Sequence, residues 1–183
     1  VAAGAADQFN QPNAASITLN RVTGAGISNI EGAVRANGQV WLLNPNGVLL
    51  GNNAANEFDG GAGNDLLRGD FGNDILIGGS GNDTLEGGTG NDTYFVDAVG
   101  DVVTEVSTSP SEIDTINATV TWALGANVER LVLGGALAIN GTGNALANTL
   151  VGNAAANVLN GGLGADVMVG GLGNDTYVVD SVA

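Results

Sequence analysis

The most regular feature of the chain is an apolar position that returns every nine residues between glycine-rich polar stretches. Four such units follow one another without a gap from Gly60 to Phe95. Each has glycine at its first and fourth positions, aspartate at its sixth and a large apolar residue at its eighth. The aspartates are Asp65, Asp74, Asp83 and Asp92, and the apolar residues are Leu67, Leu76, Leu85 and Tyr94. A short fixed period predicts a solenoid, in which each unit packs only against its neighbours.

The same pattern favours strands over helices. Glycine accepts the backbone angles of tight turns, and the apolar eighth residue anchors a very short strand between two turns. No segment shows a sustained apolar period of 3.6 residues, which an amphipathic helix would require. We therefore expect an all-β fold with little or no helix.

The repeat divides the chain into four predicted segments. Residues 1–51 lack the nonapeptide but have short apolar runs between glycine and asparagine turns, as in a β-helix. Residues 52–104 hold the first nonapeptide block, whose degenerate last unit has Asp101 at the aspartate position. Residues 105–142 are a connector with longer loops, and the nine-residue period returns in residues 143–183.

The second block differs from the first at its sixth positions. These positions hold Asn148, Asn157, Asp166 and Asp175. An asparagine side chain offers an uncharged oxygen and also donates hydrogen bonds, so we expect an asparagine ladder between neighbouring coils here.

Composition indicates a folded chain with a thin core. Hydrophobic residues make up 44% of the 183 residues, and aromatic residues only 4%. A further 31 residues are glycines. This apolar content is too high for a disordered glycine-rich linker. No apolar run reaches the roughly 18 residues of a membrane helix, so we expect no membrane insertion.

Charge restricts the partners and the chemistry. The net charge is −15, with four arginines and no lysine, histidine or cysteine, so nucleic acid is a poor partner and cations are good ones. The usual catalytic triads, thiol nucleophiles, Schiff bases and zinc–thiolate sites all lack their residues. We therefore expect a protein that is not an enzyme.

Calcium is the cation that this pattern fits best. It takes six to eight oxygen ligands in flexible geometry, more than one turn can supply. If two units make one coil, aspartates 18 residues apart stack at about 4.8 Å, the strand spacing of a sheet. The pairing then joins Asp65 to Asp83, Asp74 to Asp92 and Asp83 to Asp101. Backbone carbonyls complete these sites, from Gly61, Gly63, Gly79 and Gly81 on one edge and from Gly72, Gly88 and Gly90 on the other.

These pairs predict two to three calcium sites in residues 60–104. In residues 143–183, Asp166 stacks on Asn148 and Asp175 on Asn157 by the same rule, which predicts zero to two weaker sites. Magnesium fits less well because it demands octahedral geometry at shorter distances.

The nonapeptides from Gly60 to Phe95 resemble the RTX repeat family of secreted bacterial proteins. The resemblance implies a right-handed parallel β-roll with two nonapeptides per turn and calcium ions between successive turns. It also implies a secreted, extracellular or cell-surface location and export through a type I channel.

A second resemblance covers residues 9–51. The motif Asn44-Pro45-Asn46-Gly47-Val48, with the stretch from Asn10 to Gly24 before it, is similar to the haemagglutination-activity domain of two-partner-secretion exoproteins. This family is filamentous haemagglutinin-like, and the resemblance implies a right-handed parallel β-helix. The sequence indicates no particular receptor.

The main functional hypothesis is a calcium-binding β-roll module that folds and becomes rigid in extracellular calcium. The alternative is a structural or adhesive protein, in which calcium is only a structural ion and exposed strand edges let solenoids assemble end to end. A third possibility is an appendage of a secreted lipase or protease.

Overall fold

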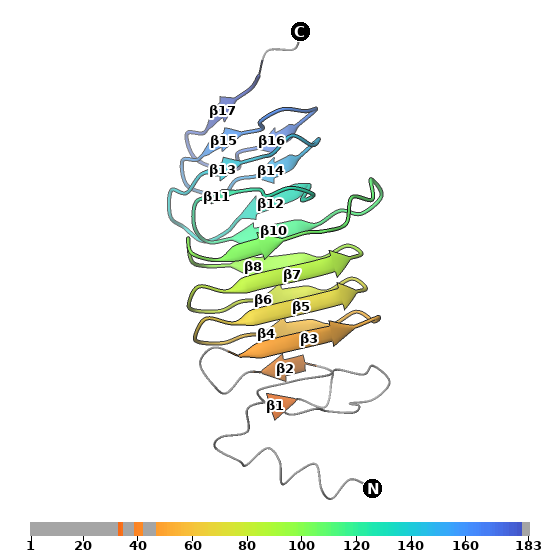
Figure 1. Ribbon diagram of the computed structural model, residues 1–183. Helices are drawn as coiled ribbons and strands as arrows, with labels where there is room; N and C mark the ends of the chain where they lie inside the picture. The colour runs from red at the N-terminus through yellow and green to blue at the C-terminus, as the bar shows by residue number, and fades with distance from the viewer. Residues whose placement is uncertain (1–32, 35–38, 42–46, 181–183) are drawn as a thin grey trace, which may run out of the picture.

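The chain is a stack of β-strand coils in the computed structural model, which describes residues 33–34, 39–41 and 47–180 (Figure 1). These residues form 17 strands and no helix, and hence no helix that could cross a membrane. The strands stack in coils as a β-solenoid of about seven turns. The predicted all-β solenoid is therefore confirmed.

Two faces of the solenoid are sheets. One face is a single nine-stranded sheet, and the other is divided into two four-stranded sheets. The nine-stranded sheet contains, in spatial order, β1 (Ala33–Val34), β2 (Gln39–Trp41), β4 (Glu57–Asp59), β6 (Ile75–Ile77), β8 (Thr93–Val96), β10 (Thr115–Ala118), β12 (Arg130–Leu133), β14 (Thr149–Val151) and β16 (Val167–Val169). The first four-stranded sheet contains β3 (Val48–Asn52), β5 (Leu66–Phe71), β7 (Thr84–Thr89) and β9 (Val102–Thr104). The second contains β11 (Trp122–Ala123), β13 (Gly141–Thr142), β15 (Val158–Asn160) and β17 (Thr176–Val178).

Pairing is parallel throughout the described strands, apart from the antiparallel pair of β1 and β2. In the first block, Leu67 pairs with Leu85 across β5 and β7, and Leu76 pairs with Tyr94 across β6 and β8. Equivalent residues are thus 18 apart, so two nonapeptides make one coil, as predicted.

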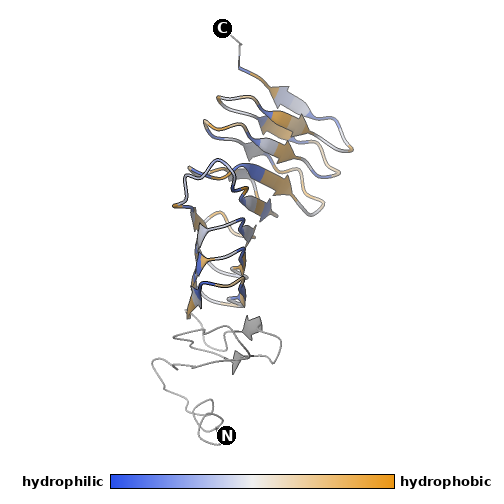
Figure 2. Ribbon diagram, turned by 90° about the vertical axis from the view of Figure 1, so that its right-hand side faces the viewer, coloured by the Kyte–Doolittle hydropathy of each residue, from blue (hydrophilic) through white to orange (hydrophobic). Residues whose placement is uncertain are grey.

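The regular step is interrupted after β9. The chain leaves the stack in a loop between β9 and β10, which projects to one side in Figure 1. It then rejoins the nine-stranded sheet with Ile116 beside Tyr94. In Figure 2 the strands of the coils from β3 to β9 are strongly foreshortened, whereas those of the last coils are seen from the side. The strand direction therefore turns about the axis of the stack in this region.

One column of apolar side chains fills the interior. The predicted anchors Leu67, Leu76, Leu85 and Tyr94 are all fully buried. Other fully buried members of this column are Leu49, Phe58, Ile116, Leu131, Leu150 and Leu159. Tyr177, at the eighth position of the last nine-residue unit, is 49% exposed, because no later coil of the described chain covers it.

The column predicts which apolar residues stabilise the fold. Leu76→Ala should lower the free energy of unfolding by about 2–5 kcal/mol, the usual cost of emptying a buried leucine position. The matched control is Ile75→Ala in the same strand, because Ile75 points outward with 37% exposure, and its loss should be much smaller. Urea unfolding in saturating calcium measures both, and equal losses would contradict a single interior column.

Candidate metal sites

The turn aspartates form two ladders, one at each edge of the first block. In each ladder, the Oδ1 atom of an aspartate accepts a hydrogen bond from the backbone N–H of the ladder residue one coil earlier. The N–H of Asp65 donates to Asp83 at 2.8 Å, that of Asp74 to Asp92 at 2.7 Å, and that of Asp83 to Asp101 at 3.0 Å. The three stacked pairs predicted from spacing are therefore present, while their role as metal ligands stays a prediction.

The second oxygen lacks a partner in four of these carboxylates, whereas Oδ2 of Asp101 accepts the N–H groups of Asp97 and Ala98, each at 3.1 Å. The Oδ2 atoms of Asp65, Asp74, Asp83 and Asp92 are buried and accept no hydrogen bond, and none of the four residues is more than 3% exposed. These are the aspartates of the four intact nonapeptides. Burying a charged oxygen without a donor is costly, so each position favours a positive charge beside it.

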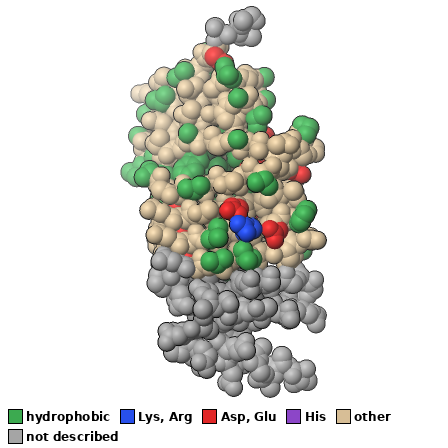
Figure 3. All heavy atoms as spheres, in the orientation of Figure 1, with side chains coloured by type: hydrophobic (Ala, Val, Ile, Leu, Met, Phe, Trp, Pro, Cys, Tyr) green, Lys and Arg blue, Asp and Glu red, His purple; other side chains and the backbone are tan. Residues whose placement is uncertain are grey.

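The protein supplies little positive charge of its own. Arg68 and Arg130 are the only cationic side chains in the described part of the chain. Arg68 is paired with Glu86 at the surface, and the face drawn in Figure 3 shows basic side chains at one place, beside acidic ones. A bound cation with a preference for oxygen therefore fits the buried carboxylates.

Burial changes the protonation of the ladders. It raises the pKa of Asp74 to about 7 and the pKa values of Asp83 and Asp92 to about 6. The pKa of Asp65 is raised for the same reason. Neighbouring carboxylates add to these shifts, as Asp92 does for Asp74. Without a cation, the folded ladders therefore hold protons more tightly than an unfolded chain does.

The turn glycines are required by the close approach of successive coils. The seven glycines whose carbonyl oxygens were predicted to bind calcium all have positive φ angles, namely Gly61, Gly63, Gly72, Gly79, Gly81, Gly88 and Gly90. A Cβ atom on Gly79 would lie 2.1 Å from the carbonyl oxygen of Gly61, and one on Gly90 would lie 1.8 Å from that of Gly72. These carbonyls thus point from one coil toward the next, and their coordination of calcium stays a prediction.

One residue takes the place of a turn glycine. Asp70 stands at the second position of its unit and has a φ of 72°. Its carbonyl oxygen faces Gly88 as that of Gly61 faces Gly79. Asp70 was not predicted as a turn residue because the repeat has glycine at this position, although aspartate tolerates this conformation better than most residues.

The second block has asparagines at its first two ladder positions, and their side chains are hydrogen-bonded within the protein. The N–H groups of Asn148 and Asn157 donate to the Oδ1 atoms of Asp166 and Asp175, at 2.8 and 2.9 Å. The side-chain Nδ2 of Asn148 donates to the carbonyl of Val128 at 3.1 Å, and Nδ2 of Asn157 donates to the preceding coil likewise. The side-chain amide nitrogen of asparagine thus donates a hydrogen bond at the position where an aspartate of the first block has an Oδ2 atom without a donor.

The ladder that contains Asp74 and Asp92 continues beyond the residues predicted from sequence. The N–H of Asp92 donates to Asp114 at 2.7 Å, and the N–H of Asp114 donates to Glu129 at 2.9 Å. These steps span 22 and 15 residues, so a search at a fixed period misses both acceptors. The available signal was the triplet Asp92-Thr93-Tyr94, which recurs as Asp114-Thr115-Ile116.

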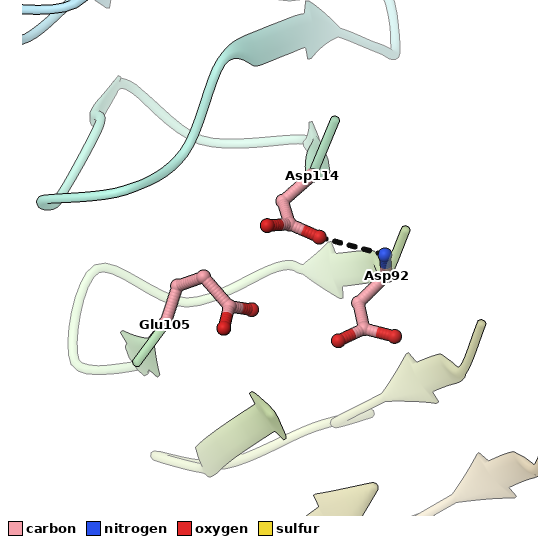
Figure 4. Close-up of side chains that lie close together, drawn as sticks. All are labelled: Asp92, Glu105 and Asp114. Carbon is pink, nitrogen blue, oxygen red and sulfur yellow. Dashed lines mark hydrogen bonds between the residues drawn. The ribbon is translucent and has the colours of Figure 1, made fainter. Parts of the chain in front are cut away.

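Asp114 also belongs to a cluster of carboxylates. Oxygens of Asp92, Glu105 and Asp114 lie within 4.8 Å of one another (Figure 4). All three side chains are buried, and burial raises the pKa of Asp114 to about 7. Glu105 was not predicted as a site residue, because it falls in the connector where the period is lost.

Comparison with known families matches these turns to a described repeat. The family model of the RTX calcium-binding nonapeptide repeat matches the chain four times, over residues 50–85, 59–94, 68–103 and 142–177. These stretches are RTX calcium-binding nonapeptide repeats. Glu105, Asp114 and Glu129 fall between the RTX segments.

A second family model, the TPS secretion domain, matches residues 1–60. It agrees with the two-partner-secretion resemblance, most of which lies outside the described residues. RTX repeats and TPS domains are both characteristic of secreted bacterial proteins.

Two curated proteins are similar to a short part of the chain. The heme/hemopexin-binding protein of Haemophilus influenzae (strain ATCC 51907 / DSM 11121 / KW20 / Rd) is 54% identical over 43 residues, and a heme/hemopexin-binding protein of Haemophilus influenzae is 49% identical over 43 residues. Each match covers 24% of this chain and 5% of the relative. The chain therefore spans a very small part of these relatives' length. No solved structure matches the chain.

The raised pKa values predict the pH dependence of the metal-free fold. Asp74 and Asp114 titrate near pH 7 when folded, against 3.8 for an unperturbed aspartate. The folded state binds more protons than the unfolded state in this interval, so its stability falls as the pH rises from about 4 to about 7. In chelator, the urea midpoint should be higher at pH 5 than at pH 8. A midpoint that rises with pH would contradict this assignment.

The close contacts between coils predict a strong effect of a single methyl group. Gly79→Ala combines an unfavourable φ of 89° with the clash against Gly61, so it should cost at least about 1–3 kcal/mol of unfolding free energy. Gly125→Ala is the control, because its nearest atom would lie 3.8 Å from the new Cβ. Thermal unfolding in calcium measures both, and equal stabilities would refute the tight coil contact.

Proposed function

We propose that this chain is a calcium-binding β-solenoid module of a secreted bacterial protein, and that extracellular calcium drives it to fold. The observation that carries the proposal is the set of four buried Oδ2 atoms without donors, one in each intact RTX repeat. The two ladders place carboxylates from successive coils next to each other. This arrangement supplies the oxygen-only donors that calcium prefers.

We propose two to three sites in residues 60–104. They lie between the stacked pairs Asp65–Asp83, Asp74–Asp92 and Asp83–Asp101, with glycine carbonyls as further ligands. In residues 143–183 we propose at most two weaker sites at Asp166 and Asp175, because each has an asparagine rather than a carboxylate on the preceding coil.

Calcium would change the balance between the folded and unfolded states. Without it, folding buries several carboxylates that are ionised at neutral pH or must take up protons, and the strands are only two to six residues long. With it, the binding free energy adds directly to the folding free energy. The asparagine ladder carries no such charge, so we expect the second block to need less calcium.

The N-terminal match supports a secretory role for the first part of the chain. We propose that the TPS segment, residues 1–60, directs export, and that the RTX repeats then meet calcium outside the cell. Release into the medium and retention at the cell surface both agree with this route.

The alternative is a structural or adhesive rod that assembles end to end. The continuous nine-stranded sheet favours it, since one rigid stack runs through both repeat blocks. The RTX solenoid is a structural calcium-binding fold rather than a typical enzyme, and we propose no catalytic role.

A calcium titration followed by circular dichroism tests the proposal. The chain should gain β signal cooperatively with calcium and not with magnesium. Asp74→Ala with Asp83→Ala removes two carboxylate ligands worth about 1.5–3 kcal/mol each and does not supply the amide nitrogen that is hydrogen-bonded in the second block. The calcium midpoint of this double variant should rise at least about tenfold.

The control is Glu86→Gln, whose carboxylate lies at the surface beside Arg68, and its midpoint should stay at the wild-type value. A chain that is fully folded in chelator and indifferent to calcium would disprove calcium-driven folding. Fibres that persist in chelator would then favour the structural rod.

A further inference from the structure

The loop between β9 and β10 returns to the stack with a glutamate in a glycine column. Thr104 pairs with Glu86, so the next residue, Glu105, continues the column of Gly87. A Cβ atom on Gly87 would lie 2.3 Å from Oδ2 of Asp92. That partnerless oxygen therefore points toward the column in which Glu105 carries a carboxylate.

Glu105 is fixed in this position by several hydrogen bonds. Its Oε2 accepts the hydroxyl of Tyr94 at 2.6 Å, and its Oε1 accepts the N–H groups of Val106 at 2.8 Å and Ser107 at 3.1 Å. Tyr94 is fully buried and Glu105 is 7% exposed. The carboxylate is thus held inside the protein, facing Asp92 and Asp114 (Figure 4).

The separations match a single ion. Two oxygens that each lie about 2.4 Å from one calcium ion can be at most about 4.8 Å apart. Oxygens of Asp92, Glu105 and Asp114 meet this limit. Asp92 and Asp114 each use only one oxygen for the ladder bond, and a carboxylate has lone pairs for further contacts.

Two more carboxylates surround the cluster. A cavity of about 110 Å³ lies beside it, lined by Glu112, Asp114 and Glu129 with hydroxyl groups of the loop. The Oε2 atom of Glu112 is buried there without a hydrogen-bond partner. None of these acidic side chains forms an ion pair within the described part of the chain.

We propose that Asp92 of the last intact nonapeptide binds a calcium ion together with Glu105 and Asp114, which lie outside the nonapeptide pattern, with Glu112 and Glu129 adding negative charge around it. The inference rests on the proposed calcium function, but all of these residues except Asp92 lie between the RTX segments, which end at 103 and resume at 142. The ion joins the projecting loop to the coil of β8 and β10, where the repeat itself is interrupted.

Calcium titration calorimetry on the full chain tests this site. Glu105→Gln should bind one calcium ion fewer than the wild type, because it removes a charged ligand from the centre of the cluster. Glu112→Gln should keep the number of ions and weaken one of them about tenfold, since calcium affinity follows the charge around the site. Glu86→Gln is the matched control and should bind as the wild type does.

The outcomes separate this site from the ladders. Asp83→Asn should lose ladder ions and keep the ion that depends on Glu105. If Glu105→Gln folds in calcium with the wild-type number and affinities, the proposed site is wrong and the ladder function stands. If Glu105→Gln does not fold, unchanged binding by Glu112→Gln overturns the site. A wild-type chain that binds no calcium overturns both proposals.

Discussion

The interaction on which this structure depends is the contact between a turn carboxylate and the coil before it. One oxygen receives a backbone N–H from that coil, which fixes the register of the stack. The other oxygen of Asp65, Asp74, Asp83 and Asp92 is buried without any donor. The ladder therefore specifies where the coils lie, and it leaves buried charges that no group in the described part of the chain compensates.

The two repeat blocks solve the same geometric problem differently. Asn148 and Asn157 occupy the ladder position in the second block, and their amide nitrogens donate to carbonyls of the preceding coil. A difference of one side-chain atom, nitrogen for oxygen, thus separates ladder positions with a hydrogen-bonded amide from ladder positions with a buried oxygen that has no donor in the described chain. The solenoid joins both kinds of ladder along one sheet.

What the sequence could predict depended on the period. The burial of Leu67 and Leu76 and the stacking of Asp65 on Asp83 follow from two nine-residue units per coil, so they could be found without coordinates. The period does not reach Asp114 or Glu105, because the loop after β9 changes the step between coils. Only the recurring triplet pointed to Asp114, and long-range packing decides that Glu105 meets the ladder. Tyr177 is half exposed because no later coil of the described residues covers it, and a local motif does not encode what packs on it.

The 18-residue register also has a consequence for how such a chain can change its length. Gaining or losing two whole units leaves every downstream residue on its original face and edge. Gaining or losing one unit exchanges the two edges, yet both ladders persist because consecutive units follow the same pattern. Other changes of length require a loop that takes up the extra residues, as in the step of 22 residues from Asp92 to Asp114. The architecture therefore tolerates duplication and deletion of nonapeptides, which change its number of stacked turn aspartates.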